Sequence, residues 1–195
     1  MTHDPTQVLV LPGVPALLPA HAGLTDPVAE LRAAALEGVR LLREASDRVA
    51  VVTGPASADD VRRGVTVGAG ERVARHLLDG AEVTVHTEVP AGARAVLVVG
   101  NGSATRTEKA PGHLDERAEG FDAALGGALA AADGDRLADL DLDLAAQLWA
   151  DAAPLAALGR RLQAGAAAGE RWRTEVLHDG APYGVQYWVA RLRTV

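Results

Sequence analysis

Short, uninterrupted apolar runs alternate with helical patterns along most of the chain. The runs Val8–Leu11, Val49–Val52 and Ala95–Val99 are rich in β-branched residues, and each one ends at a turn that contains glycine. Runs of this kind are typical of strands that are covered on both faces. Glu82–His86 alternates polar and apolar residues instead, so it predicts a half-exposed strand at the edge of the sheet.

Apolar residues spaced three and four positions apart predict helices between and after these strands. The stretches with this spacing are residues 28–42, 72–78, 114–132 and 140–162. Asp26 is the expected cap of the first helix, with Pro27 in its first turn. Pro154 interrupts the last stretch, which therefore predicts two helices.

The C-terminal part of the chain has a different pattern. Trp172–Leu177 and Val185–Leu192 have strand-like composition and flank His178–Pro182, whose Asp-Gly pair and proline predict the turn of an antiparallel hairpin. The low-complexity stretch Ala164–Gly169 predicts a loop or a frayed helix end. Strands that alternate with helices and end in a hairpin predict an α/β fold, a three-layer α/β/α domain with a mixed sheet.

Length, charge and composition narrow the classes of protein. At 195 residues the chain fits one domain, residues 1–195, given roughly 150 residues per domain. The absence of cysteine excludes disulfide scaffolds, zinc–thiolate sites and iron–sulfur clusters. With 26 acidic and 19 basic residues the net charge is −7, which disfavours nucleic acid and anionic membranes as partners. Residues 1–7 lack the lysine or arginine of a secretory signal, which favours a cytoplasmic location.

Three predicted strand ends carry glycine and are candidates for a binding site. In open α/β sheets, ligands bind beyond the carboxyl ends of the strands. The candidate loops are Pro12-Gly13, Thr53-Gly54-Pro55 and Gly100-Asn101-Gly102-Ser103. The alternative is that these glycines only end the strands. No phosphate-binding P-loop spacing follows the third strand, and the G-x-S-x-G pattern of a serine nucleophile is absent around Ser103.

Three segments resemble one known family. The first is the run Leu11–Pro19, and the second is Gly100–Ala104 followed by Ala110–Arg117 and Phe121-Asp122. The third is Ala181–Tyr187. Together they are similar to the class III extradiol ring-cleavage dioxygenase catalytic-subunit superfamily, which includes the protocatechuate 4,5-dioxygenase β-subunit and Memo proteins. The segments occur in family order and span nearly the whole chain, and the middle one is closest to an actinobacterial subgroup.

The resemblance implies a fold but not an intact active site. Active members hold Fe(II) with two histidines and one glutamate, and a further histidine serves as acid and base. Gly13 stands where the first metal histidine is expected, and Ala104 stands where the acid/base histidine is expected. The stretch Gly54–Asp60, which corresponds to the second histidine loop, has no histidine. Asp151 is the nearest plausible carboxylate ligand and Gln147 the nearest amide. We therefore expect no cofactor here, in contrast to the Fe(II) of active relatives.

Three functions are compatible with these residues. The first is a catalytically degenerate family member that binds a small molecule or a protein through the former active-site cleft. We expect no catalytic or metal residues in it, and the candidate ligand-binding positions are Gly13, Gly54, Asn101, Ser103 and Thr105. The second is an active metal-dependent ring-cleavage oxidoreductase with relocated ligands, drawn from His113, Asp115, His178 and Asp151. The third is a structural, homo-oligomeric interaction protein whose aromatic C-terminal hairpin forms an interface.

Overall fold

A computed structural model describes residues 5–19, 26–56 and 58–195. Among these residues, six strands form one sheet in the order β3-β2-β4-β1-β6-β5. The strands are β1 (Gln7–Leu11), β2 (Arg48–Thr53), β3 (Glu82–His86), β4 (Ala95–Val99), β5 (Trp172–Gly180) and β6 (Tyr187–Thr194). The first four pair in parallel, whereas β6 runs antiparallel to both β1 and β5. The sheet is therefore mixed, and it ends in an antiparallel hairpin as the sequence predicts.

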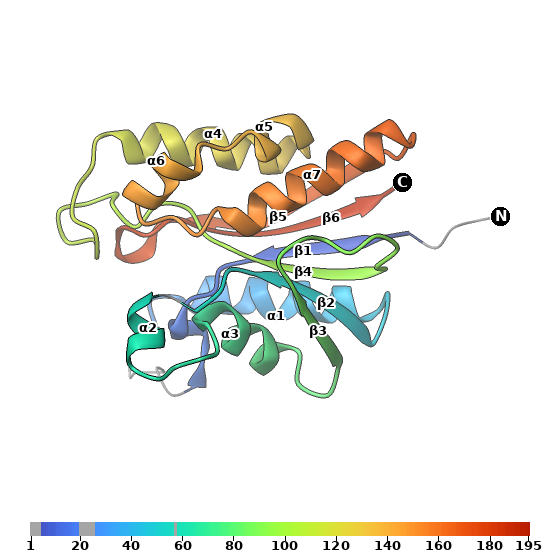
Figure 1. Cartoon of the computed structure of the whole chain (residues 1–195), viewed down its shortest axis with the longest axis horizontal. Coiled ribbons are helices and arrows are strands. Elements are labelled where there is room, and N and C mark those ends of the chain that lie inside the picture. The colour runs from blue at the N-terminus through green and yellow to red at the C-terminus, as the bar shows by residue number, and fades with distance from the viewer. Residues whose placement is uncertain (1–4, 20–25, 57) are drawn as a thin grey trace.

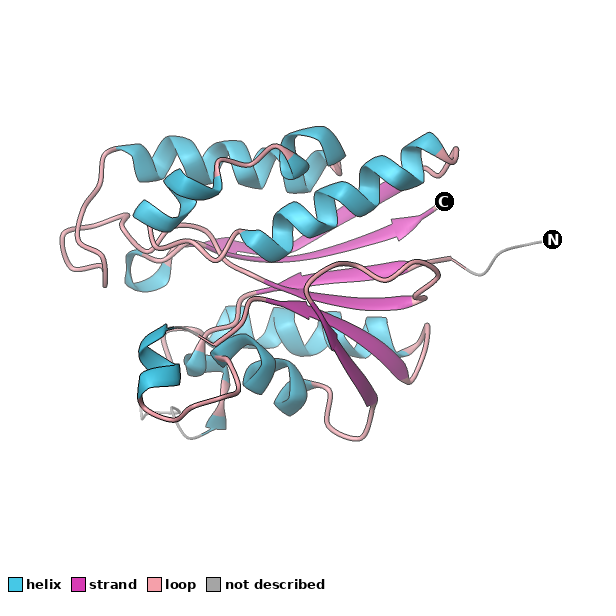
Figure 2. Cartoon of the chain, in the orientation of Figure 1, coloured by secondary structure: helices cyan, strands magenta, loops and turns pink. Residues whose placement is uncertain are grey.

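Helices cover both faces of the sheet and give the predicted three layers (Figures 1 and 2). The α-helices are α1 (Ala29–Arg43), α2 (Ala58–Arg62), α3 (Ala69–Leu77), α4 (Arg117–Ala131), α5 (Gly134–Ala138), α6 (Leu142–Gln147) and α7 (Ala153–Ala167). Short 3-10 turns occur at Pro15–Leu17 and Pro182–Gly184. In Figure 1, α1 to α3 lie on one side of the sheet and α4 to α7 on the other.

The apolar runs become central strands because both of their faces are covered. Alternate residues of β1 belong to opposite cores, with Leu9 and Leu11 on the α1 side and Val8 and Val10 on the α7 side. These residues are fully buried. A strand that contributes to two cores needs apolar residues at every position, which explains the absence of polar alternation. By contrast, β3 lies at the edge of the sheet and is only half-buried.

Two predicted helix starts differ from the structure. Helix α1 begins at Ala29, so Pro27 lies outside it; Asp26 accepts a hydrogen bond from the Val28 amide at 3.1 Å but is not the residue at the cap position. Helix α4 begins at Arg117, and Leu114 lies before it with 52% of its surface exposed. In both cases the apolar spacing continues past the end of the helix, because spacing alone does not mark where backbone hydrogen bonding begins.

The C-terminal hairpin also differs in detail from the prediction. Strand β5 continues to Gly180, so Asp179 and Gly180 pair with β6 and the turn lies after them. The extra length of β5 includes an irregularity between Val176 and His178. Residues 164–167 form the end of α7, so of the two alternatives predicted for this stretch the structure shows a helix end and not a loop. The short helices α2 and α5 carry too few turns for their periodicity to be recognised in the sequence.

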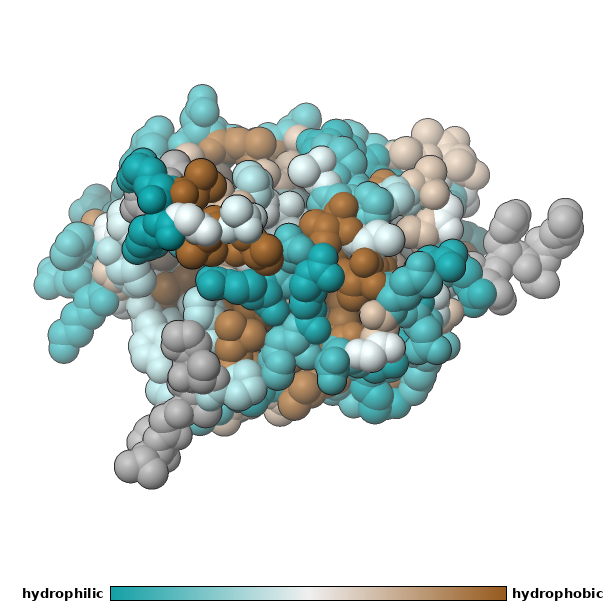
Figure 3. All heavy atoms as spheres, turned by 60° about the horizontal axis from the view of Figure 1, so that its bottom comes forward, coloured by the Kyte–Doolittle hydropathy of each residue, from teal (hydrophilic) through white to brown (hydrophobic). Residues whose placement is uncertain are grey.

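The surface on the α1–α3 side is mixed in character. Figure 3 shows separate apolar patches among hydrophilic side chains on this face. The exposed aliphatic residues come from different elements, namely Leu36, Val61, Val67 and Val85. None of the helices in the described part of the chain is long and apolar enough to cross a membrane.

Candidate functional site

The three predicted glycine loops lie at the same edge of the sheet. Strands β2, β4 and β1 are neighbours, and Val99 is paired with both Thr53 and Leu11 at their carboxyl ends. Gly13, Gly54 and Asn101 each follow one of these strands. The parallel register therefore brings together segments that are widely separated in the sequence. We call this edge, with Asp151, the strand-end site.

The two glycines at the strand-end site have different neighbours. A Cβ atom at Gly13 would lie 2.8 Å from Gly70 Cα and 2.9 Å from Val99 Cγ1. Gly13 therefore allows α3 to pack closely against the strand ends. This close contact explains why a glycine, and no larger residue, occupies position 13. A Cβ atom at Gly54 would instead lie 3.3 Å from Asp151 Oδ1. Gly54 thus leaves room beside a carboxylate.

Asp151 is the most unusual charged residue of this edge. Its backbone carbonyl accepts a hydrogen bond from the Asn101 amide at 3.2 Å, which fixes it beside the end of β4. Its side chain is partly buried but accepts no hydrogen bond and forms no ion pair within the described residues. Burial raises the pKa of the Asp151 carboxyl from 3.8 to about 6. No cation or hydrogen-bond donor among the described side chains offsets the loss of hydration of the charged form.

Asn101 adds a second polar side chain with an unused hydrogen-bond acceptor. Its side-chain Nδ2 donates to the Gly102 carbonyl at 3.0 Å, and this bond directs the amide. No donor within the described chain reaches its Oδ1. The strand-end site therefore presents acceptor oxygens from Asn101 and Asp151, and it suits a ligand that donates hydrogen bonds.

A cavity of about 630 Å³ opens next to these residues, beyond the ends of β2 and β3. Gly54 lines it, together with Gly68, Glu71, His86 and Glu88 among others. Both glutamates already have partners, since Glu71 pairs with Arg75 at 2.8 Å and Glu88 pairs with Arg160 at 2.6 Å. Gly54 thus borders the cavity and also lies close to the unpaired carboxylate of Asp151, which does not itself line the cavity.

Ser103 and Thr105 lie inside the protein and do not line this cavity. Ser103 is fully buried, and both its amide and its hydroxyl donate to Asp122, at 2.8 and 2.6 Å. Burial raises the pKa of Asp122, and the hydrogen bonds from Ser103 and Arg106 offset part of that effect. Thr105 is 2% exposed, and its hydroxyl has no hydrogen-bond partner among the residues that the structure describes. The structure thus brings Gly54 and Asn101 together with Asp151 and places Ser103 in a buried structural contact.

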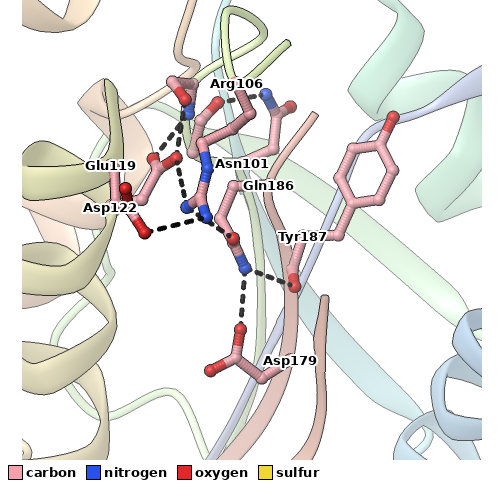
Figure 4. Close-up of polar contacts among 9 residues, drawn as sticks. Asn101, Arg106, Glu119, Asp122, Asp179, Gln186 and Tyr187 are labelled. Atoms are coloured by element: carbon pink, nitrogen blue, oxygen red, sulfur yellow. Dashed lines mark hydrogen bonds and ion pairs between the residues drawn. The ribbon is translucent and has the colours of Figure 1, made fainter. Parts of the chain in front are cut away.

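Asp122 belongs to a polar network that the sequence did not reveal (Figure 4). Arg106 Nη1 lies 3.4 Å from Asp122 Oδ2 and 3.4 Å from Gln186 Oε1. Gln186 Nε2 in turn donates to Asp179 Oδ1 at 2.7 Å. The network joins the loop after β4, helix α4 and the hairpin. The segments that resemble the family contain Asp122 and Gln186 of this network, but nothing in the sequence indicated that they meet.

The residues present do not fit an Fe(II) centre. Neither Gly13 nor Ala104 can ligate a metal, and no group of three histidine or carboxylate side chains suited to a metal ion occurs in the described parts of the chain. Asp115 is engaged by Arg117 at 2.7 Å, and that contact lowers the pKa of Asp115 to about 2. His113 is exposed on a loop, and the Nε2 atom of His178 is buried without a partner in the described part of the chain. His3 and His21 lie outside the described residues.

Neither a known protein-family model nor any curated protein sequence matches the chain.

Proposed function

We propose that this protein is a catalytically degenerate member of the class III extradiol dioxygenase-like superfamily that binds a small, hydroxyl-bearing molecule at the strand-end site. The observation that carries the proposal is the carboxylate of Asp151. It is partly buried, has no partner within the described residues, and lies beside Gly54, which itself lines a 630 Å³ cavity.

An unpaired, partly buried carboxylate lowers the stability of a protein, so it calls for an explanation. A ligand hydroxyl that donates to Asp151 would supply the missing partner and favour the charged form. Asn101 Oδ1 offers a second acceptor on the next strand end. Adjacent hydroxyl groups on one ring, as in catechol, match a pair of acceptors of this kind.

The side chains at the strand-end site support ligand binding rather than ring cleavage by the family's mechanism. That mechanism needs two metal histidines and a histidine acid/base, and two of the matching positions carry Gly13 and Ala104. Asp151 alone can accept or release a proton, but it cannot replace the lost ligands. The proposal therefore assigns recognition to this edge and no redox step.

Calorimetric titration with catechol tests the proposal. The wild-type protein is expected to bind catechol saturably, and 1,2-dimethoxybenzene, which has the same ring but no hydroxyl donor, is expected not to bind. Gly54→Ala places a methyl group 3.3 Å from Asp151 Oδ1 and should weaken catechol binding at least about tenfold. Gly120→Ala is the matched control, because a Cβ atom there meets nothing within 4 Å.

Equal binding of the two ring compounds, or unchanged catechol binding by Gly54→Ala, would reject the strand-end site. Metal content gives an independent check. After anaerobic incubation with Fe(II) and removal of free metal, elemental mass spectrometry should find no stoichiometric iron. Retained iron at one equivalent would overturn the loss of the metal centre and support ring cleavage instead.

A further inference from the structure

A second cavity, of about 270 Å³, lies between α4 and the hairpin formed by β5 and β6. It is distinct from the strand-end site, and its walls come from other residues. Its polar groups come from Arg106, Asp122, Asp179, Gln186 and Trp188. Figure 4 shows that these groups, apart from Trp188, converge from the loop after β4, from α4 and from the hairpin. We call this cavity the hairpin pocket.

Two side chains of the hairpin pocket have N–H groups that are not used in hydrogen bonds. Trp188 is 3% exposed as a residue, but its indole Nε1 is not fully buried, and its N–H forms no hydrogen bond within the described residues. This N–H is therefore open to a ligand in the pocket, which Trp188 lines. Arg106 is held loosely, because its contacts with Asp122 and Gln186 are both 3.4 Å long. A guanidinium group has five N–H donors, so most of those of Arg106 remain available.

Carboxylates lie at the outer part of the same pocket. Asp179 Oδ1 accepts from Gln186, and Asp179 Oδ2 has no donor within the described chain. Glu119 is 85% exposed and lies 3.9 Å from Arg106 Nη2. The pocket therefore combines donors in its wall with negative charge at its rim.

Glycines on α4 make room for a ligand in the pocket. A Cβ atom at Gly126 would lie 3.0 Å from Trp188 Nε1, so any side chain there would cover the free N–H. Gly127 also lines the pocket, and a Cβ atom there would meet nothing within 4 Å. Adjacent glycines inside a helix are costly relative to alanine, and here they leave the indole edge open.

From these observations we infer that the hairpin pocket binds a small zwitterion of the α-amino acid type. The ligand carboxylate accepts from Arg106 and from the Trp188 N–H, and its ammonium group lies near Asp179 and Glu119. Arginine suits this role because its planar fork matches a carboxylate. A volume of 270 Å³ is sufficient for a small amino acid.

Titration calorimetry with free glycine as the probe tests this inference. The wild-type protein should bind glycine at least about tenfold more tightly than acetate or methylamine, which each carry only one of the two charges. Asp179→Asn keeps the Oδ1 acceptor for Gln186 and removes the charge. It should weaken glycine binding about tenfold and should not weaken acetate binding, because acetate has no ammonium group to pair with Asp179.

A second variant addresses the pocket wall. Gly126→Ala should abolish glycine binding, whereas Gly120→Ala on the same helix should not alter it. The inference is overturned if the wild-type protein does not bind glycine at up to about 10 mM, or if Asp179→Asn binds it as tightly as the wild type. Loss of glycine binding in Asp151→Asn, with Asp179→Asn unaffected, would place the ligand at the strand-end site instead. Because catechol binding is tested with different residues, either proposal can fail without the other.

Discussion

Replacing Asp151 with asparagine should raise the stability of the protein at neutral pH and leave it nearly unchanged at pH 4. The pKa of this carboxyl is 3.8 ordinarily and about 6 in the folded protein. Between these values the folded protein holds a proton that the unfolded chain has released. Stability therefore falls as the pH rises through this window, and the full penalty is present above pH 6.

The size of the stability change follows from the pKa shift of Asp151. A difference of one pKa unit corresponds to about 1.4 kcal/mol, so the penalty for ionised Asp151 reaches about 3 kcal/mol at pH 7.5 and about 0.5 kcal/mol at pH 4. Helix α7 begins at Ala153, and the positive end of its dipole lowers the penalty by up to about 1 kcal/mol. A gain of about 2 to 3 kcal/mol at pH 7.5 corresponds to a rise in Tm of about 5–10 °C for a chain of this length.

Urea unfolding measured by tryptophan fluorescence between pH 4 and pH 8 provides the assay. The quantity of interest is the difference in unfolding free energy between Asp151→Asn and the wild type at each pH. Asp79→Asn is the control, since this carboxylate is exposed and its side chain forms no bond in the described part of the chain. A difference that does not change with pH would refute the reasoning, because it would mean that Asp151 ionises in the folded protein as easily as in water.

Other substitutions test further contacts. Ser103→Ala removes the hydroxyl that donates to Asp122 at 2.6 Å and should destabilise the protein by about 1–3 kcal/mol, measured by urea unfolding. Gly159→Ala should lower the free energy of unfolding by about 3 kcal/mol or more, because the new Cβ atom would overlap the backbone nitrogen of Ala138. A change below about 1 kcal/mol would show that α5 and α7 are not closely packed. Gly120→Ala on α4 should instead raise the free energy of unfolding by about 0.5–1 kcal/mol, and Tm with it, since its Cβ atom meets no described atom within 4 Å.

The local pattern of the chain was sufficient to predict most of the fold. Strands β1, β2 and β4 follow from uninterrupted β-branched runs, because only a strand covered on both faces keeps such runs out of water. The alternation in β3 marked an edge strand, and the glycines marked the strand ends. These features depend on residues that are neighbours in the sequence.

The exact ends of the helices and strands were harder to predict from the sequence. Asp179 and Gly180 have the composition of a turn, yet they pair with β6 as strand residues. Leu114 continues the apolar spacing of α4 but lies outside it and is exposed. Pairing with a neighbouring strand and access to solvent are decided by the rest of the chain, and they override local preference.

The two candidate binding sites depend on the tertiary structure. Asp151 lies beside Gly54 and Asn101 only because parallel pairing of β2, β4 and β1 aligns their carboxyl ends. Arg106 reaches Gln186 only because the hairpin folds back onto the loop after β4. The sequence by itself determined which residues are buried in strands and which carry charge. The tertiary structure decided which charges lack a partner, because partnership is a matter of distance between segments that the chain brings together only when it folds.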